Sequence, residues 1–249
     1  GGWGNSIAAS AGVVLPLVAM EHLYAVTEPL EVLAPYKAGD ASLPIIRHWE
    51  GGIYIRDEGQ CAGIGSFNHR ALPVSDADMV SNLQNLADPS KLPFTQVDWD
   101  PGWAETILIA PVLKDRKFET AYNGVFPYSS DGLPLMGQAP TVDGLWVLEC
   151  VWATHSVGAA RSLAQAICGI APDIDFAPGD LTRFDNAELT RVDFEQRCDN
   201  AYVDTYAIHH PAEPSNSPRG VRMSPFYSEQ EKLDAAFFDT SGWERPRWY

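Results

Sequence analysis

Short runs of β-branched and aromatic residues, separated by glycine and proline, mark the first third of the chain. Such runs predict extended strands, and Gly51-Gly52 between two of them is typical of a hairpin. We therefore expect an antiparallel sheet here. The predicted strands are Val13 to Thr27 with a break at Pro16, Ile45-Ile46, Ile53 to Ile55, and Cys61 to Phe67.

Helical spacing of apolar residues follows. Ser75 to Asp78 is a good helix start, and Met79, Leu83 and Leu86 come after it at helical intervals. The other predicted elements are helices at Asn5 to Ala11, Trp103 to Leu113 and Thr154 to Ile170 (ending near Gly169), strands at Phe118 to Phe126 and Leu145 to Trp152, and a turn-rich loop at Tyr128 to Gly137. The predicted fold class is α+β.

The composition changes after Arg183-Phe184. Charges, prolines and isolated aromatic residues dominate Asp185 to Tyr249. We interpret this stretch as a wrapping connector rather than a packed domain, with one short helix at Glu229 to Phe238. The predicted domains are therefore 1–185 and a connector, 186–249.

Composition and charge narrow the class of protein. The chain has 249 residues, 45% of them hydrophobic, and 8 are Trp, which is typical of a globular protein with a real core. A net charge of -16 argues against nucleic acid as a partner. The 4 cysteines are widely spaced without a CxxC pair, so no zinc site or disulfide framework is predicted. No apolar stretch reaches the roughly 18 to 20 residues of a membrane span.

His22-Leu23-Tyr24 is the first candidate for chemistry. Residues two apart on a strand point to the same face, so the imidazole and the phenol would lie side by side. They could then hydrogen-bond a carboxylate or position an amine. An ordinary sheet face with a half-buried tyrosine fits the same pattern.

A second candidate is Leu145 to Ala160, an apolar strand and a turn followed by a helix of small residues. Thr154 and Ser156 are candidate N-caps. The free N–H groups and partial positive charge of a helix start favour an anion or the polar edge of a cofactor. A plain strand–turn–helix unit is the alternative.

A third candidate is Asn123 to Phe126 with the following turn at Ser130 to Pro134. Gly124 inside a strand indicates close approach of the backbone to something flat. A decorated hairpin is the alternative. The other histidines are weaker candidates. His69-Arg70 could hold a carboxylate through the guanidinium, although a surface role is favoured, and His209-His210 is interpreted as structural.

Taken in chain order, these motifs form a collinear series. They are GGWG, PLVAMEHLYAVTEP, LPIIRHWEGGIYIRDE, GIGSFNHR, NGVFPYSSDGLPLMG, VWATHSVGAARSLAQ, LTRF, RMSPFY and GWERPRWY. The series resembles D-amino-acid-oxidase-type flavoproteins, in particular the dimethylglycine oxidase, sarcosine dehydrogenase and dimethylglycine dehydrogenase family, over essentially the whole chain.

The resemblance implies roles for individual residues. It makes 13–122 a substrate subdomain and 123–172 the return of the chain to a Rossmann-like FAD-binding layer. Tyr24 matches an active-site tyrosine near flavin and substrate, with His22 in support. The residues that match positions around the FAD or its substrate are Trp3, Gly124, Phe126, Val151, Trp152, Ala153, Thr154, His155 and Ser156.

The reaction that the resemblance implies is oxidation of an N-methyl amine. Hydride passes to the flavin, and water or tetrahydrofolate takes up the one-carbon unit. Three alternatives stay open: a non-catalytic scaffold subunit, a folate-dependent one-carbon transfer protein with a degenerate flavin domain, and an oxidase for another secondary amine.

The family's G-x-G-x-x-G nucleotide-binding unit is not found in these residues. We therefore expect a piece of a longer polypeptide, or a subunit completed by others. Its partners would be an N-terminal nucleotide-binding segment and a C-terminal folate domain that binds tetrahydrofolate. Alone, the chain would hold FAD weakly or not at all. A cytoplasmic or a mitochondrial matrix location is expected.

Overall fold

The computed structural model describes residues 1–36, 41–85, 87–184, 191–208, 210, 213, 218–240 and 243–249. The chain divides into two compact units, each described by itself. Unit 1 is Gly1–Ser10, Val18–Tyr128 and Tyr202–Ile208, and unit 2 is Ala11–Leu17, Ser129–Ala201 and His209–Tyr249. The predicted boundary between 185 and 186 lies outside the described residues, as do Leu86 and His209.

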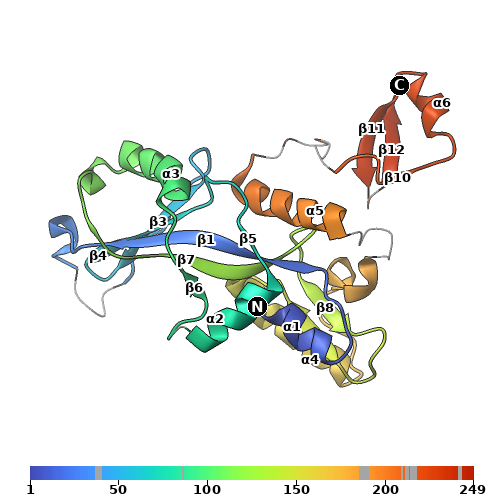
Figure 1. Cartoon of the computed structure of the whole chain (residues 1–249), viewed down its shortest axis with the longest axis horizontal. Helices are drawn as coiled ribbons and strands as arrows, with labels where there is room; N and C mark the ends of the chain where they lie inside the picture. The colour runs from blue at the N-terminus through green and yellow to red at the C-terminus, as the bar shows by residue number, and fades with distance from the viewer. Residues whose placement is uncertain are drawn as a thin grey trace. The chain divides into compact units, whose positions relative to one another are not determined.

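Figure 1 labels helices and strands and colours the chain from blue at the N-terminus to red at the C-terminus. The helices are α1 (Gly4–Ser10), α2 (Asp76–Asn85), α3 (Gln96–Ile109), α4 (Ala153–Ile167), α5 (Arg191–Val203) and α6 (Tyr227–Glu231). The strands are β1 (Leu17–Thr27), β2 (Ile46–His48), β3 (Ile53–Glu58), β4 (Cys61–Ser66), β5 (Pro73–Val74), β6 (Lys91–Leu92), β7 (Phe118–Ser129), β8 (Leu135–Gln138), β9 (Trp146–Glu149), β10 (Arg222–Met223), β11 (Ala236–Thr240) and β12 (Trp243–Trp248). Short 3-10 turns are η1 (Glu31–Leu33), η2 (Pro111–Leu113), η3 (Ala177–Gly179), η4 (Leu181–Arg183) and η5 (Asp204–Tyr206).

A large sheet forms the centre of unit 1. Its strand order is β2-β3-β4-β1-β7-β6, and β5 pairs with β1. The pairs β2–β3, β3–β4, β1–β4 and β6–β7 are all antiparallel. The predicted α+β class with an antiparallel sheet flanked by helices is confirmed.

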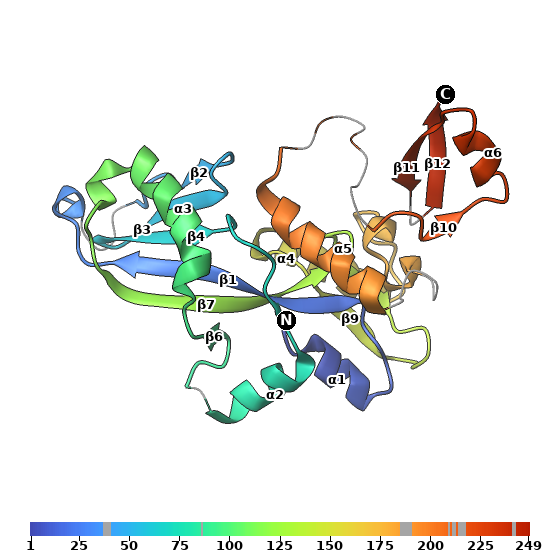
Figure 2. The same cartoon turned by 45° about the horizontal axis from the view of Figure 1, so that its top comes forward.

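One face of this sheet, the helix face, is apolar and covered by α3 (Figure 2). Leu23, Ala25 and Ile64 are each fully buried there, with Trp99 of α3 packed on them. A Cβ atom on Gly102 would collide with Ser66 of β4, so glycine permits the close approach of α3 to the sheet.

The start of α3 differs from the sequence expectation. The helix begins at Gln96 rather than at Trp103, and it contains Pro101. Proline usually marks a helix boundary. Here the burial of Trp99 against the sheet outweighs the hydrogen bond that Pro101 cannot donate. By contrast, α2 starts as expected, since the Ser75 hydroxyl accepts the Asp78 N–H at 3.1 Å.

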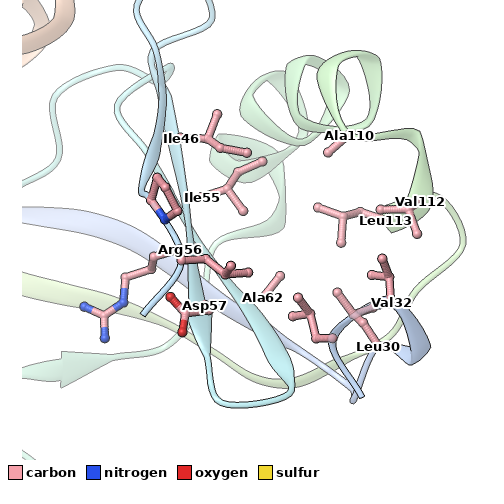
Figure 3. Close-up of a pocket in the computed structure, with 13 residues that line it drawn as sticks. Leu30, Val32, Ile46, Ile55, Arg56, Asp57, Ala62, Ala110, Val112 and Leu113 are labelled. Carbon is pink, nitrogen blue, oxygen red and sulfur yellow. The ribbon is translucent and has the colours of Figure 1, made fainter. Parts of the chain in front are cut away.

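A small cavity opens on the helix face, between β2–β4 and the turns η1 and η2 (Figure 3). Its volume is about 170 Å³, and its lining is largely apolar, with Ile46, Ile55 and Leu113 among the residues. Small-molecule sites usually span about 300–1,000 Å³ and carry convergent polar groups. We therefore do not regard this cavity as the functional site.

Unit 2 contains the β8–β9 hairpin, α4, and a second sheet of order β10-β12-β11. Gly169 ends α4 with φ +70, in the left-handed conformation of a helix C-terminus, as predicted. The expectation for 186–249 was wrong in two respects. This stretch holds the 13-residue helix α5, and Phe238 lies in strand β11 rather than in a helix.

Candidate active site

The opposite face of the large sheet carries polar and aromatic side chains; we call it the tyrosine face. Strand register puts Arg47 of β2 opposite Tyr54 of β3, and both Tyr54 and Tyr24 of β1 opposite Gly65 of β4. Directly opposed residues share a face. His22 lies two residues before Tyr24, so Arg47, Tyr54, Tyr24 and His22 all belong to the tyrosine face.

Two glycines of β4 make room for the tyrosine rings. A Cβ atom on Gly63 would collide with the Tyr24 hydroxyl, and one on Gly65 would collide with the Tyr54 ring. The rings therefore lie flat across the strand, with centroids 6.2 Å apart. The sequence run GIGS is thus explained by tyrosines from the two neighbouring strands.

Tyr24 donates a hydrogen bond of 2.7 Å to Oε1 of Glu58, which also pairs with Arg56 at 3.0 Å. Burial raises the pKa of Tyr24, and the bond to Glu58 raises it further. The phenol therefore stays protonated across the physiological range. Its proton points to Glu58, and its oxygen keeps lone pairs for another donor.

His22 is buried between two tyrosines. Its Nε2 lies 3.1 Å from the Tyr54 hydroxyl, and its Nδ1 lies 3.2 Å from the Tyr202 hydroxyl. The Tyr202 hydroxyl also lies 2.7 Å from Nε2 of His69. Burial, aided by His69, lowers the pKa of His22 to about 3, so this imidazole is neutral at physiological pH.

His22 and Tyr24 of this cluster were predicted from the sequence as site residues, whereas Tyr54, His69 and Tyr202 were not. The surface role expected for His69 is wrong, because only 8% of this residue is exposed. Arg70 does reach the surface, where its Nε donates to Asp98 at 3.0 Å. No sequence signal marks Tyr202, which is 180 residues from His22 and fully buried.

Arg47 is held by aromatic faces instead of a carboxylate. Its guanidinium carbon lies 3.8 Å from the centre of the Trp49 ring and 4.0 Å from that of Tyr206. Within the described part of the chain it has no carboxylate partner, and the residue is exposed. Stacking fixes a guanidinium while its N–H donors stay available at the edge. Arg47 can therefore bind an anion.

The other predicted residues of unit 1 lie in two places. Phe126 packs edge-on against His22, with ring centroids 5.4 Å apart. The nearest atom to a Cβ placed on Gly124 would be 3.6 Å away, so packing among the described residues does not require glycine there. Trp3 instead donates to the Met79 carbonyl at 2.9 Å and packs on the Ala19, Val74 and Met79 cluster.

In unit 2, the turn into α4 borders a pocket of about 410 Å³. Thr154 and His155 line it, together with Gly158 and Ser162. This volume lies within the usual range for small-molecule sites. No side chain caps the first turn of α4, and no acidic residue lies in it. The partial positive charge of this helix start is therefore not neutralised locally.

The expected N-caps at Thr154 and Ser156 were wrong. Trp152 occupies the N-cap position, and the Ser156 hydroxyl donates back to the Ala153 carbonyl at 2.8 Å. Both serine and threonine can satisfy their hydroxyls inside a helix in this way. Trp152, Ala153, Thr154 and His155 are all exposed.

The described residues support neither a metal site nor a membrane-spanning helix. No group of three or more His, Cys, Asp or Glu side chains gathers there in a way that could hold a metal ion. In the same residues, no helix combines the length and the apolar character needed to cross a membrane.

Solved structures share this fold. Glycine oxidase from Geobacillus kaustophilus matches 75% of this chain and 44% of its own, with 18% identity and a TM-score of 0.52. L-Proline dehydrogenase from P. horikoshii matches 73% of this chain and 44% of its own, with 17% identity and a TM-score of 0.54. The chain therefore has the fold of the matching part of these two enzymes.

Sequence comparison is more specific. The chain is homologous over its full length to sarcosine dehydrogenase of Mus musculus (26% identity, 26% of the relative) and dimethylglycine dehydrogenase of Rattus norvegicus (25% identity, 29% of the relative). The 4-methylaminobutanoate oxidase (formaldehyde-forming) of Paenarthrobacter nicotinovorans matches 99% of this chain at 25% identity, over 29% of its own length. Residues 171–224 match the FAD dependent oxidoreductase central domain. The chain spans about a quarter of the length of the sarcosine dehydrogenase.

Another relative is named as a regulatory subunit rather than as an enzyme. The pyruvate dehydrogenase phosphatase regulatory subunit of Mus musculus matches 94% of this chain at 24% identity, over 26% of its own length. Its name describes a regulatory protein rather than an oxidase or a dehydrogenase.

Proposed function

We propose that this chain forms the substrate side of an FAD-dependent oxidoreductase that demethylates a small N-methylated amino acid of the sarcosine or dimethylglycine class. The observation that carries this proposal is the tyrosine face. Its row of Arg47, Tyr54 and Tyr24 lies on β2, β3 and β1, with β4 between the two tyrosines. It combines a cation without a carboxylate partner in the described residues with two phenol oxygens.

An N-methylated amino acid carries a carboxylate and an amine, and both find suitable partners on this face. Arg47 offers oriented N–H donors to the carboxylate. Tyr24 and Tyr54 offer oxygens to the amine; the Tyr24 proton is directed to Glu58, and the Tyr54 hydroxyl pairs with Nε2 of His22. The aromatic walls exclude water and hold the ligand in one orientation.

Two features fit the flavin itself. The start of α4 has free positive character and borders the pocket lined by Thr154 and His155, which suits the polar edge of a reduced flavin. A Cβ atom on Gly124 would meet the Tyr122 ring at 3.6 Å, an ordinary contact, so packing among the described residues does not explain this glycine and a role beside the flavin fits it. Bound FAD would accept the hydride from the substrate methyl group. Trp3 and Val151 stay predictions of the resemblance, as does tetrahydrofolate as a partner of the intact protein.

A face of α4 supports the expectation of a partner segment. Exposed apolar residues recur along it at helical intervals: Ala153, Val157, Ala160, Ala164 and Ile167. Val157 is 82% exposed, which is unusual for a helix in a finished core. We expect the nucleotide-binding segment of a longer protein, or an equivalent subunit, to cover this stripe.

The test is a panel of amines given to the full-length protein that carries this chain. Sarcosine, dimethylglycine and 4-methylaminobutanoate should release formaldehyde, whereas glycine and proline should not. Arg47→Gln should raise KM for sarcosine by about tenfold or more, because a bond to a charged group is lost. Arg161→Gln is the matched control, since Arg161 pairs with Asp173 in unit 2. Turnover of glycine or proline alone would contradict the substrate class.

A second candidate function is regulatory. It is favoured by the relative that is named a regulatory subunit. In that case the full-length protein would bind a partner enzyme without oxidising any amine. A protein that purifies without flavin, turns over no amine in the panel and alters the activity of a co-purified enzyme would favour this candidate.

A further inference from the structure

The hydrogen bonds around His22 form one chain with a defined direction. The fixed point is the Arg70 carbonyl, which lies 2.6 Å from Nδ1 of His69. A carbonyl oxygen can only accept, so Nδ1 of His69 carries a proton. In the neutral ring, Nε2 of His69 is then an acceptor.

The donor and the acceptor of each further bond follow from this proton on His69. Tyr202 must donate its hydroxyl proton to Nε2 of His69, at 2.7 Å. Its oxygen therefore accepts from Nδ1 of His22, at 3.2 Å. With Nδ1 protonated, Nε2 of the neutral His22 accepts from the Tyr54 hydroxyl, at 3.1 Å. The chain runs inward from Tyr54 to the Arg70 carbonyl without a break.

The free end of the chain is the oxygen of Tyr54. Among the described residues, His22 is the hydrogen-bond partner of this hydroxyl, and its proton is directed to the imidazole. The oxygen of Tyr24 is likewise an acceptor, because the Tyr24 proton is directed to Glu58. The tyrosine face thus offers two neighbouring phenol oxygens as acceptors, with ring centroids 6.2 Å apart.

We propose that Tyr202, together with His69, is a positioning residue that locks His22 in its Nδ1–H form and so makes Tyr54 an acceptor for an N–H of a protonated amine. This inference rests on the proposed function for its substrate. It adds that the amine first binds as an ammonium ion through its N–H; the nitrogen must lose a proton before a hydride can leave the methyl carbon. Tyr54 contacts the ligand, and Tyr202 acts through His22.

Burial makes the lock effective. Tyr202 has no exposed surface, and His22 and His69 are 7% and 8% exposed. Water cannot replace a lost partner in such a site. Without the Tyr202 hydroxyl, His22 can move its proton to Nε2 and donate to Tyr54. The Tyr54 proton would then point outward and meet the N–H of the ammonium, donor against donor.

The first test needs no substrate. Nitrogen NMR of the full-length protein with labelled histidine reports which ring nitrogen of His22 carries the proton, and His22→Asn identifies the signal. We expect the Nδ1–H form in the wild type and a shift toward the Nε2–H form in Tyr202→Phe. A wild-type His22 protonated on Nε2, or on both nitrogens, at neutral pH would overturn the proposal.

The second test uses ligands of equal charge with different numbers of N–H groups. Sarcosine has two, dimethylglycine has one and betaine has none. Tyr202→Phe should weaken the binding of sarcosine and dimethylglycine by about ten- to a hundredfold and leave the Kd of betaine unchanged. Equal weakening of all three would overturn the proposal, because it would indicate general damage to the site.

Tyr128→Phe is the matched control. Tyr128 is buried and packs on Tyr202, with ring centroids 5.3 Å apart, but its hydroxyl lies 2.8 Å from Oγ1 of Thr205 and does not belong to the chain. This variant should leave the NMR signal and all three affinities unchanged. If no amine is oxidised although the Nδ1–H form is found, the proposed function fails while the direction of the chain stands.

Discussion

The two faces of the large sheet are built from alternate residues of the same strands, yet they hold together by different means. The helix face is apolar, and the side chains of Leu23, Ile55 and Ile64, which cannot hydrogen-bond, pack beneath α3. On the tyrosine face, buried polar atoms are joined in a directional chain from Tyr54 to Arg70. Burial of apolar area on the helix face stabilises the fold, whereas hydrogen bonds on the tyrosine face fix the orientation of its side chains.

The two faces should differ most in the free energy of unfolding that is lost when one side chain of each face is truncated. Ile64→Ala removes a fully buried side chain of the helix face and should lower the free energy of unfolding by about 2–5 kcal/mol. Tyr54→Phe removes only a hydroxyl at the edge of the tyrosine face. Chemical denaturation of both variants measures the contrast, and equal losses would break it.

Substitution of a glycine beneath a ring of the tyrosine face should displace that ring. Gly65→Ala would force the Tyr54 ring off the strand, with an expected loss of about 1–3 kcal/mol. Gly124→Ala is the matched control, because a Cβ atom there meets only ordinary contacts. We expect Gly124→Ala to keep its stability and to lose bound flavin in the full-length protein. A stable, fully flavinylated Gly124→Ala would remove Gly124 from the proposed site.

The pH dependence of stability should contain a contribution from His22 of the tyrosine face. His22 titrates near 6.5 in the unfolded chain, whereas burial and His69 hold its pKa in the folded protein to about 3. Between these values only the unfolded state binds the proton. Stability is therefore complete above about pH 6.5 and should fall toward pH 3 by up to about 1.4 kcal/mol per pH unit.

Burial also lowers the pKa of His69, against the opposing influence of the Arg70 and Ser66 backbone and of Asp98, so His69 adds to this slope in the same direction. Denaturation curves between pH 4 and 7, an interval within the histidine and carboxylate range, would measure it. His22→Gln should flatten the slope, whereas His155→Gln, at an exposed position, should leave it unchanged. An unchanged slope in His22→Gln would contradict a buried neutral His22.

The smallest effect on stability is expected for Tyr54→Phe itself. Its hydroxyl sits at the end of the chain, so the loss should stay within about 1 kcal/mol. Its effect on function should be larger, with KM for dimethylglycine raised by about tenfold. Steady-state kinetics of the full-length variant would show this, and an unchanged KM would exclude Tyr54 from the amine site.

Local patterns predicted an antiparallel sheet flanked by helices and part of the tyrosine face. Period-two spacing put His22 and Tyr24 on one side of β1, and Gly51-Gly52 indicated the β2–β3 hairpin. The chain to His69 could not be predicted, because its central group, Tyr202, is 133 residues from His69. No local rule connects residues at that separation.

The second sheet was missed for a different reason. Pro246 argues against a strand, since proline cannot donate to a ladder. In the structure, β12 pairs with β10 only at Trp243 and Glu244, so Pro246 lies beyond that pairing and opposite Phe237 of β11. The roles of Trp3, Tyr24 and the Val151 to Ser156 turn stay predictions that only ligand-bound or kinetic data can test.

The most direct test of the central claim is an absorbance spectrum of the full-length protein that carries this chain, recorded without oxygen before and after addition of dimethylglycine. We expect a band at about 450 nm, typical of oxidised flavin, that bleaches on addition of the amine. A colourless protein, or a flavin band that no N-methylated amino acid bleaches, would contradict it.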